Sequence, residues 1–202
     1  MHIREHGTRL FAVAALLLLI TLSACGGSDT PESPDSGGQS TGGAVTPIEG
    51  GRLVYGLTLA PSGIDPHVDA SSELGIPLTS VYDTLVYQDV DGSFVPGLAE
   101  RWDIAQDGRT YTFYLRRDVK FHDDTQFDAE AVKFNLDRIA NPEMRSRKAR
   151  GMLGPYSHTE VVDDFTVKVH FDEPYAPILD SLSQVYLGIA SPTAVQQWGA
   201  EY

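Results

Sequence analysis

Apolar residues follow different patterns in the two parts of this chain. Near the N-terminus, Leu10 to Leu22 form an apolar run broken only by Thr21, and Arg4 and Arg9 precede it. A membrane-spanning helix needs roughly 20 apolar residues, so this run is too short. A short apolar run behind positive charge is typical of a secretory signal peptide. A buried helix of the mature domain is the alternative, which the lack of a polar face disfavours.

Beyond residue 50 the apolar residues alternate or recur at helical spacing. Alternation over Arg52–Leu59 predicts a strand that ends at Pro61-Ser62-Gly63. Apolar residues at helical spacing predict a helix over Pro77–Leu85, with Pro77 in its first turn. Asp128 is placed to cap another helix, which runs to Ile139 and ends at Asn141-Pro142.

Three pairs of alternating segments are separated by turn residues and predict antiparallel hairpins. The turns are Asp91-Gly92, Gln106-Asp107-Gly108 and Asp163-Asp164. Late in the chain, Ser191-Pro192 has the pattern of a helix cap followed by proline at the first helical position. No repeat is evident, and the pattern as a whole predicts an α+β fold rich in hairpins.

A single cysteine follows the N-terminal apolar run. Leu22-Ser23-Ala24-Cys25 resembles the bacterial lipobox, in which the cysteine thiolate accepts a diacylglyceryl group. Two acyl chains are enough for stable anchoring. We therefore expect residues 1–24 to be a lipoprotein signal peptide and Cys25 to carry the lipid. A plain signal peptide that happens to end at a cysteine is the alternative.

Composition separates a tether from a domain. Residues 26–50 contain 17 Gly, Ser, Thr or Pro among 25 positions and no aromatic residue. Such a stretch cannot bury enough apolar surface to fold, so residues 25–50 are expected to be a flexible tether. Both tryptophans and all nine tyrosines lie in 51–202, which is enough chain for one domain.

Charge argues against one class of partner. The net charge of −13 disfavours nucleic acid, because phosphate binding needs a basic face. The basic residues Arg145, Arg147, Lys148 and Arg150 form the one cluster. We interpret it as a solvated loop, with a phosphate site as the alternative.

Motifs throughout 51–202 resemble one known family, the family 5 extracytoplasmic solute-binding proteins of ABC importers. The matching segments are Gly63-Ile64-Asp65-Pro66-His67, Val81-Tyr82-Asp83-Thr84-Leu85-Val86, Val95 to Trp102, Asp107 to Asp123, Asp128 to Val132 and Ser191-Pro192. Three positions depart from the usual pattern: the family has Gly at Asp124, Pro at Gln126 and Thr at Asp128. The ordered set of motifs carries the resemblance, since each one alone is weak.

The resemblance implies a periplasmic-binding-protein-like type II fold, in which two lobes enclose the solute. Residues 51–66 and 186–202 would belong to lobe one, and about 67–180 would form a subdomain inserted in it. Family members are much longer than this chain, so the resemblance implies that the second lobe is missing and that the sequence is a fragment or a truncated gene.

The resemblance also implies function and partners. The protein would capture a peptide or a similar solute outside the cytoplasm, in the periplasm or on the outer face of the cytoplasmic membrane. It would deliver the solute to permease and ATPase subunits, with no cofactor and no catalysis. Pro61, Ser62, Gly63 and Ile64 would leave the first strand at the cleft edge, where their backbone can pair with an extended peptide.

Two polar motifs have competing interpretations. His122-Asp123-Asp124 has the residue types of a metal or acid–base cluster, but three adjacent side chains point in different directions and favour a turn. Asp65-Pro66-His67 is a candidate catalytic group, although Asp-Pro more often starts a turn. No catalytic or metal-binding residue is therefore assigned.

Two other functions remain open at this stage. A lipid-anchored hydrolase would need a nucleophile–base set or a metal set, and no G-x-S-x-G or H-E-x-x-H motif is present. A sensor ectodomain on the same scaffold is the other alternative.

Overall fold

The computed structural model describes residues 50–60, 63–68 and 71–199. The predicted signal peptide, Cys25 and nearly all of the tether lie outside the described residues, as do Pro61 and Ser62. Leu53–Tyr202 forms one compact unit. Among the described helices, none is both long enough and apolar enough to span a membrane.

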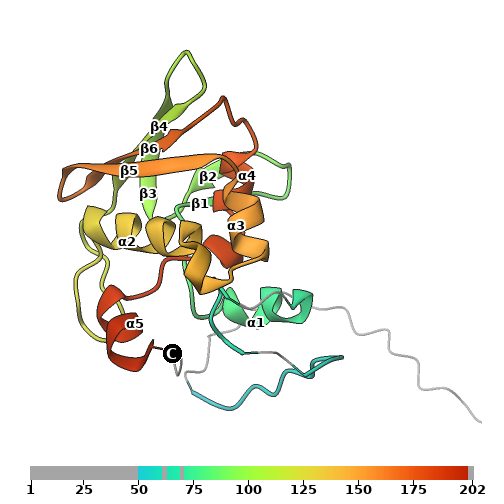
Figure 1. Ribbon diagram of the computed structural model, residues 1–202. Helices are drawn as coiled ribbons and strands as arrows, with labels where there is room; N and C mark the ends of the chain where they lie inside the picture. The colour runs from blue at the N-terminus through green and yellow to red at the C-terminus, as the bar shows by residue number, and fades with distance from the viewer. Residues whose placement is uncertain (1–49, 61–62, 69–70, 200–202) are drawn as a thin grey trace, which may run out of the picture. The chain divides into compact units, whose positions relative to one another are not determined.

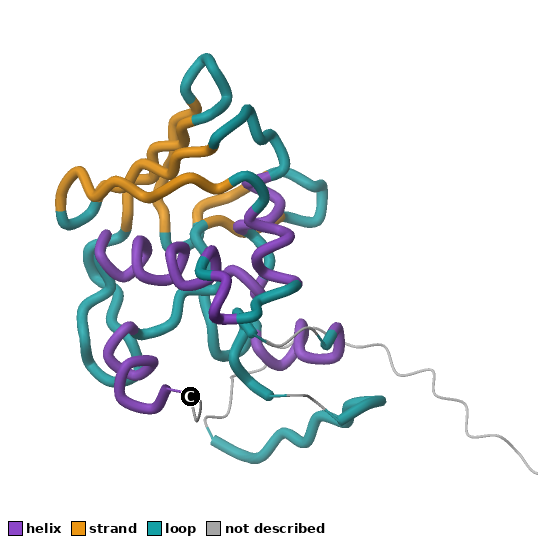
Figure 2. The backbone as a smooth tube through the Cα atoms, viewed as in Figure 1, coloured by secondary structure: helices purple, strands orange, loops and turns teal. Residues whose placement is uncertain are grey.

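Two antiparallel sheets organise this unit (Figures 1 and 2). The larger sheet has the order β3-β4-β6-β5, and a smaller one pairs β1 with β2. The strands are β1 Val86–Gln88, β2 Phe94–Pro96, β3 Ala99–Ile104, β4 Thr110–Leu115, β5 Tyr156–Asp163 and β6 Thr166–Phe171. All three predicted hairpins are confirmed, because β1–β2, β3–β4 and β5–β6 are each joined through the predicted turn.

One face of the larger sheet forms the core. Alternate residues of β4 and β6 are buried, among them Phe113, Val167 and Val169. The helix α2, Ala129–Ala140, packs against this sheet and contributes Leu136 and Ile139 to the same core. Asp128 caps α2 by accepting a hydrogen bond from the Ala131 amide at 2.8 Å, as predicted.

Shorter helical segments complete the unit. They are η1 Ser72–Leu74, α1 Gly75–Leu78, η2 Pro142–Met144, α3 Lys148–Leu153, α4 Ile178–Leu182, η3 Val185–Leu187 and α5 Pro192–Trp198, where η denotes a 3-10 turn. The Ser191 hydroxyl accepts a hydrogen bond from the Ala194 amide and caps α5, which confirms that prediction. In Figure 2 the helices lie to one side of the four-stranded sheet.

The predicted helix over Pro77–Leu85 is wrong beyond Leu78. The α1 helix ends there. The residues that follow are held by distant segments, because the Ile189 amide donates to the Asp83 carbonyl and the Leu98 amide donates to the Thr84 carbonyl. Leu85 is nevertheless buried, in the extended segment that leads into β1. Leu85 is therefore apolar because it packs in the core, although it does not belong to the helix.

The predicted strand over Arg52–Leu59 is also wrong for the described chain. These residues form no strand, and Leu53 and Val54 are 91% and 76% exposed. A strand exists only when a neighbouring strand supplies hydrogen bonds, and no described segment pairs with this one.

The basic cluster is not simply a loop. Lys148 and Arg150 belong to α3, whereas Arg145 and Arg147 lie in the segment before it. Ala149 and Leu153 of α3 are buried, so apolar residues interleaved with the basic ones anchor this short helix in the core.

Two glycines provide a matched test of this packing. Hydrogen bonds from Leu98 and Ala99 hold residues 97–99 against Thr84 and Leu85, so a Cβ atom on Gly97 would lie 2.5 Å from the Thr84 carbonyl oxygen. Gly97→Ala should lower the free energy of unfolding by about 2 kcal/mol. Gly151 in α3 has open space around it, so Gly151→Ala should raise that free energy by about 0.5–1 kcal/mol.

Urea unfolding of the two variants checks this prediction. If Gly97→Ala is as stable as the unmodified chain, the close contact between the two segments is not present in solution.

Candidate functional site

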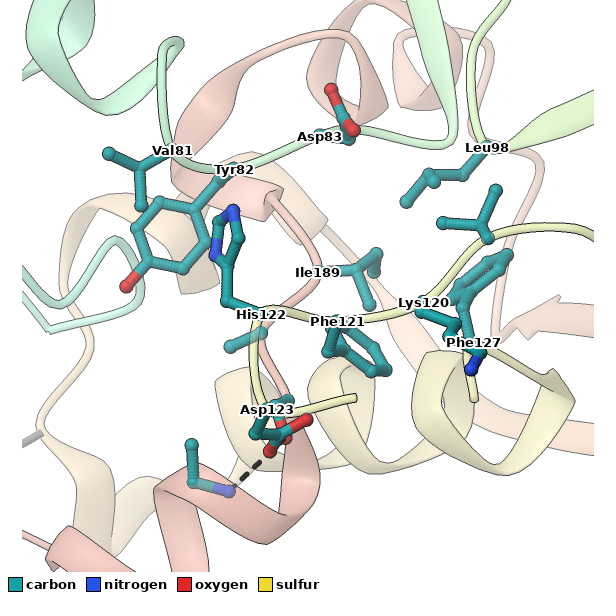
Figure 3. A pocket seen from close by; sticks show the side chains of 14 residues that line it. Val81, Tyr82, Asp83, Leu98, Lys120, Phe121, His122, Asp123, Phe127 and Ile189 are labelled. Carbon is teal, nitrogen blue, oxygen red and sulfur yellow. Dashed lines mark hydrogen bonds between the residues drawn. The ribbon is translucent and has the colours of Figure 1, made fainter. Parts of the chain in front are cut away.

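A half-enclosed cavity of about 340 Å³ lies where three loops meet. The loops are Val81–Asp83 after α1, Val119–Asp123 after β4 and Ile189–Ser191 before α5. Apolar side chains, among them Phe121, line much of the cavity. In Figure 3, Tyr82 and His122 lie toward one end, and Leu98 and Phe127 lie toward the other.

Ionisable groups also line this cavity. Asp83, Lys120 and His122 contribute both signs of charge beside the apolar wall. A cavity of this kind is suited to a ligand with an apolar body and polar ends, because binding sites usually combine apolar walls with a few polar groups. Among the described residues, no group of three His, Cys, Asp or Glu side chains is arranged to hold a metal ion.

The His122-Asp123-Asp124 motif forms a turn, as predicted. Asp124 has a φ of 65°, which favours glycine, and glycine is the residue usual in the resembled family at this position. The carboxylate of Asp123 accepts hydrogen bonds from Ser191 and Thr125, which hold the pKa of Asp123 below its usual value. Asp123 therefore ties the turn to the start of α5 and is engaged structurally.

Asp65 and His67 meet Arg138 in the interior. The Arg138 guanidinium donates to both Asp65 carboxylate oxygens, and its Nη1 also lies 2.7 Å from His67 Nδ1. On the other side of the ring, His67 Nε2 lies 2.8 Å from the Gly188 carbonyl oxygen. Because Arg138 can only donate and a carbonyl can only accept, Nδ1 must be unprotonated and Nε2 must carry the proton.

This arrangement makes His67 a neutral, structural residue. The side chain is almost fully buried, at 1% exposed. Burial lowers the pKa of His67 to about 4; the charge of Arg138 acts in the same direction, and the Gly188 hydrogen bond opposes it. Burial raises the pKa of Asp65, but hydrogen bonding and charge from Arg138 outweigh this and leave it lowered. The turn interpretation of Asp65-Pro66-His67 is thus favoured over a catalytic one.

A second residue of α2 extends the buried network. The Asn135 side-chain amide donates to the Ala190 carbonyl at 2.8 Å, and its oxygen accepts from the Ala190 amide at 2.9 Å. Together with the hydrogen bond between His67 and the Gly188 carbonyl, it fixes residues 188–190 and therefore one wall of the cavity. In the sequence, Asn135 and Arg138 are adjacent to the apolar residues Leu136 and Ile139 of the predicted helix, which indicates that they lie near the core. The sequence did not reveal their distant partners.

A third junction was also missed from the sequence. The Tyr186 hydroxyl donates to the Ser71 carbonyl at 3.0 Å, and Lys148 Nζ lies 3.5 Å from the centre of the Tyr186 ring. A cation over an aromatic face is attractive, so the contact holds α3 against η3 and the segment before η1. It also gives one member of the basic cluster a defined partner.

The predicted ligand-contact segment is described only at two of its four residues. Gly63 is half-buried, and Ile64 is 62% exposed and available for contact. Neither residue lines the cavity in Figure 3, which is therefore a separate candidate. Ligand contact by Pro61, Ser62, Gly63 and Ile64 stays a prediction.

Comparison with known proteins identifies the chain's family. The model of bacterial extracellular solute-binding proteins, family 5 (middle region), matches residues 93–201, which is more than half of the chain. The chain belongs to this family. The match contains the whole four-stranded sheet, α2 and the α5 cap, so the resemblance read from the motifs is confirmed.

Curated family 5 relatives bind different solutes, according to their names. The glutathione-binding protein GsiB of Pectobacterium atrosepticum is 38% identical over 141 residues, covering 69% of this chain and 27% of the relative. The dipeptide-binding protein of Escherichia coli is 33% identical over 168 residues, covering 71% and 30%. The chain thus spans less than a third of the length of these relatives.

Solved family 5 structures confirm the fold class. NikA of Brucella suis, in complex with Fe(III)-EDTA, has 34% identity and a TM-score of 0.59, with 65% of this chain and 26% of that one covered. NikZ of Campylobacter jejuni, in complex with Ni(L-His), has 27% identity and a TM-score of 0.60, with 70% and 27% covered. Since these structures are periplasmic binding proteins with two lobes, the chain is an α+β portion of that fold.

The neutral state of His67 predicts how stability depends on pH. In the unfolded chain His67 protonates near pH 6.5, whereas in the folded unit its pKa is about 4. Since the unfolded state binds the extra proton, stability should fall as the pH drops below about 6.5, by up to about 1.4 kcal/mol per pH unit. His67→Asn should remove this dependence between pH 6.5 and 5, and the exposed His122→Asn should keep it.

Urea unfolding at a series of pH values measures the effect. An NMR titration of the His67 ring in the unmodified chain gives an independent reading if His67→Asn fails to fold. An His67 pKa near 6.5 would contradict the buried neutral state.

Proposed function

We propose that this chain is part of the lipid-anchored, solute-binding component of an ABC importer. The observation that carries the proposal is the family 5 match over residues 93–201. It is supported by relatives that are named as glutathione- and dipeptide-binding proteins. The complete protein would capture a solute outside the cytoplasm and deliver it to permease and ATPase subunits, without chemical change.

A small peptide, or a solute of similar size and polarity, is the ligand that we propose. The relatives named for their solutes bind glutathione and dipeptides, which carry a backbone amide together with charged ends. Ile64 is 62% exposed, so the segment around it is accessible to a peptide that would pair with its backbone. The net charge of −13 disfavours strongly anionic ligands at non-specific sites.

The lipid anchor rests on the sequence alone. Leu22-Ser23-Ala24-Cys25 follows a short apolar run and precedes Gly26-Gly27. Attachment at Cys25 would place a tether of about 25 residues between the membrane surface and the folded unit. As a flexible coil, such a tether has an r.m.s. span of about 25–30 Å, which lets the unit move close to a membrane-embedded permease.

Labelling tests the anchor. Cells that express the chain should incorporate labelled palmitate into the wild-type protein and not into Cys25→Ser, because the thiolate is the acceptor. Immunoblotting must show equal expression of the two proteins. Equal labelling of both would place the lipid elsewhere or show that the signal comes from a contaminant.

Ligand binding by the complete gene product tests the proposed function and the contact segment together. The wild type should bind at least one solute from a panel of glutathione, di- to pentapeptides and nickel–histidine, as measured by calorimetry. Gly63→Trp should raise the dissociation constant at least tenfold, or about 1.4 kcal/mol, because the bulky ring blocks close approach. Val90→Trp, at a fully exposed turn between β1 and β2, is the matched control and should bind normally.

The possible results separate the two claims. No binding of any panel member by the wild type would contradict the proposed function. Normal binding by Gly63→Trp would leave the function intact and would show that the cleft lies away from Pro61–Ile64.

A further inference from the structure

Two charged side chains on the wall of the cavity in Figure 3 are available to a ligand. Within the part of the chain that the structure describes, the ammonium group of Lys120 has no ion-pair partner, and the side chain is exposed. Asp83 accepts a hydrogen bond from the Tyr87 hydroxyl on Oδ1, at 2.6 Å, and no described group donates to its other carboxylate oxygen. The cavity thus offers one cation and one carboxylate oxygen.

Backbone hydrogen bonds hold both residues at the cavity. The Ile189 amide donates to the Asp83 carbonyl at 2.9 Å, which fixes Asp83 beside the cavity wall. Lys120 pairs with Gln126 in an isolated antiparallel bridge, which fixes the loop after β4. In the view of Figure 3, Asp83 lies above Ile189, whereas Lys120 lies below it. The two charges therefore border one cavity from different segments of the chain.

The rest of this wall is largely apolar. Phe127 is fully buried, and its ring meets that of Phe121 edge to face, with centroids 6.1 Å apart. Leu98 and Ile189 also line the cavity and are buried. Such a wall favours an apolar body, because the transfer of apolar surface out of water is favourable. The volume of about 340 Å³ is at the small end of the range for ligand pockets, about 300–1,000 Å³, so the ligand is small.

We propose that this cavity binds a free apolar amino acid, at a second site separate from the predicted solute contact at Pro61–Ile64. The ligand's ammonium group pairs with Asp83, its carboxylate pairs with Lys120, and its side chain packs against Phe121 and Phe127. A zwitterion matches both charges, whereas an anion would be repelled by Asp83 and a cation by Lys120. The four-carbon side chain of Lys120 is flexible, so its ammonium group can adjust to the carboxylate.

One wall of the cavity is already rigid before a ligand binds. Residues 188–190 are held by hydrogen bonds to His67 and Asn135. A preorganised wall reduces the entropy that is lost on binding. A ligand that contacts this wall and the loops 81–83 and 119–123 binds only the folded chain, so it should also raise the melting temperature.

Calorimetry of the full chain with L-phenylalanine and two analogues tests the site. Phenylpropionic acid lacks the ammonium group, and phenylalaninamide lacks the carboxylate. One phenylalanine per chain should bind. Each analogue should bind about threefold to fivefold more weakly, because each loses one ion pair in a partly solvated setting.

Variants that remove one charge assign the two ends of the ligand. Asp83→Asn keeps an oxygen for the Tyr87 hydroxyl, and it should weaken phenylalanine about threefold to fivefold without weakening phenylpropionic acid. Lys120→Met should weaken both of these compounds by a similar factor and should not weaken phenylalaninamide. Lys168→Met removes the same charge from a residue that does not line the cavity, so it is the matched control and should bind all three normally.

A bulky residue at the cavity tests its location. Val81 lines the cavity and is 51% exposed, so Val81→Trp should fold and should weaken phenylalanine binding at least tenfold by filling the space. Val90→Trp places the same ring at a fully exposed turn and should bind normally. In NMR spectra of the unmodified chain, phenylalanine should shift the ring signals of His122, which lines the cavity, and not those of His158.

The outcomes separate this site from the importer function. Absence of phenylalanine binding, or binding that Val81→Trp leaves unchanged, would overturn the proposal. Equal binding of all three compounds would overturn it as well, because the charges would then play no part. Solute binding by the complete gene product is measured independently, so either claim can fail while the other holds.

Discussion

The buried guanidinium of Arg138 is the constraint on which the rest of this unit depends. A charge in the interior must be paired, and removing one partner of such a pair costs about 3–5 kcal/mol. Arg138 meets this requirement with Asp65 and His67, which lie about 70 residues earlier in the chain. Gly188 then satisfies the far side of the His67 ring. Three distant segments are therefore held in one arrangement by the need to neutralise a single cation.

This constraint also shapes the candidate site. The segment that contains Gly63 and Ile64 is anchored by the ion pair between the next residue, Asp65, and Arg138. Residues 188–190 are held by hydrogen bonds to His67 and Asn135. One of these segments is the predicted ligand contact, and the other forms a wall of the cavity. A solute-binding protein benefits from such rigidity, because a preorganised site loses less entropy when the ligand binds.

The two faces of the four-stranded sheet differ in polarity. Its inner face is apolar and packs on α2, whereas its outer face carries interacting polar pairs such as Arg101 with Tyr114 and Glu160 with His170. Antiparallel sheets allow this division, because one face can remain solvated. The outer face therefore stays solvated, while the inner face supplies the core.

Local signals in the sequence determined the hairpins, the α2 cap at Asp128 and the α5 cap at Ser191, because turns and caps depend on residues close together in the chain. The ordered motifs likewise identified the family. Tertiary structure alone decided that Arg52–Leu59 is not a strand and that the helix after Gly75 stops at Leu78, since both depend on distant partners. It also decided the pairing of Arg138 with Asp65 and of Asn135 with Ala190. Buried polar groups that meet from distant parts of the chain are set by long-range packing, which the spacing of residues along the chain does not encode locally.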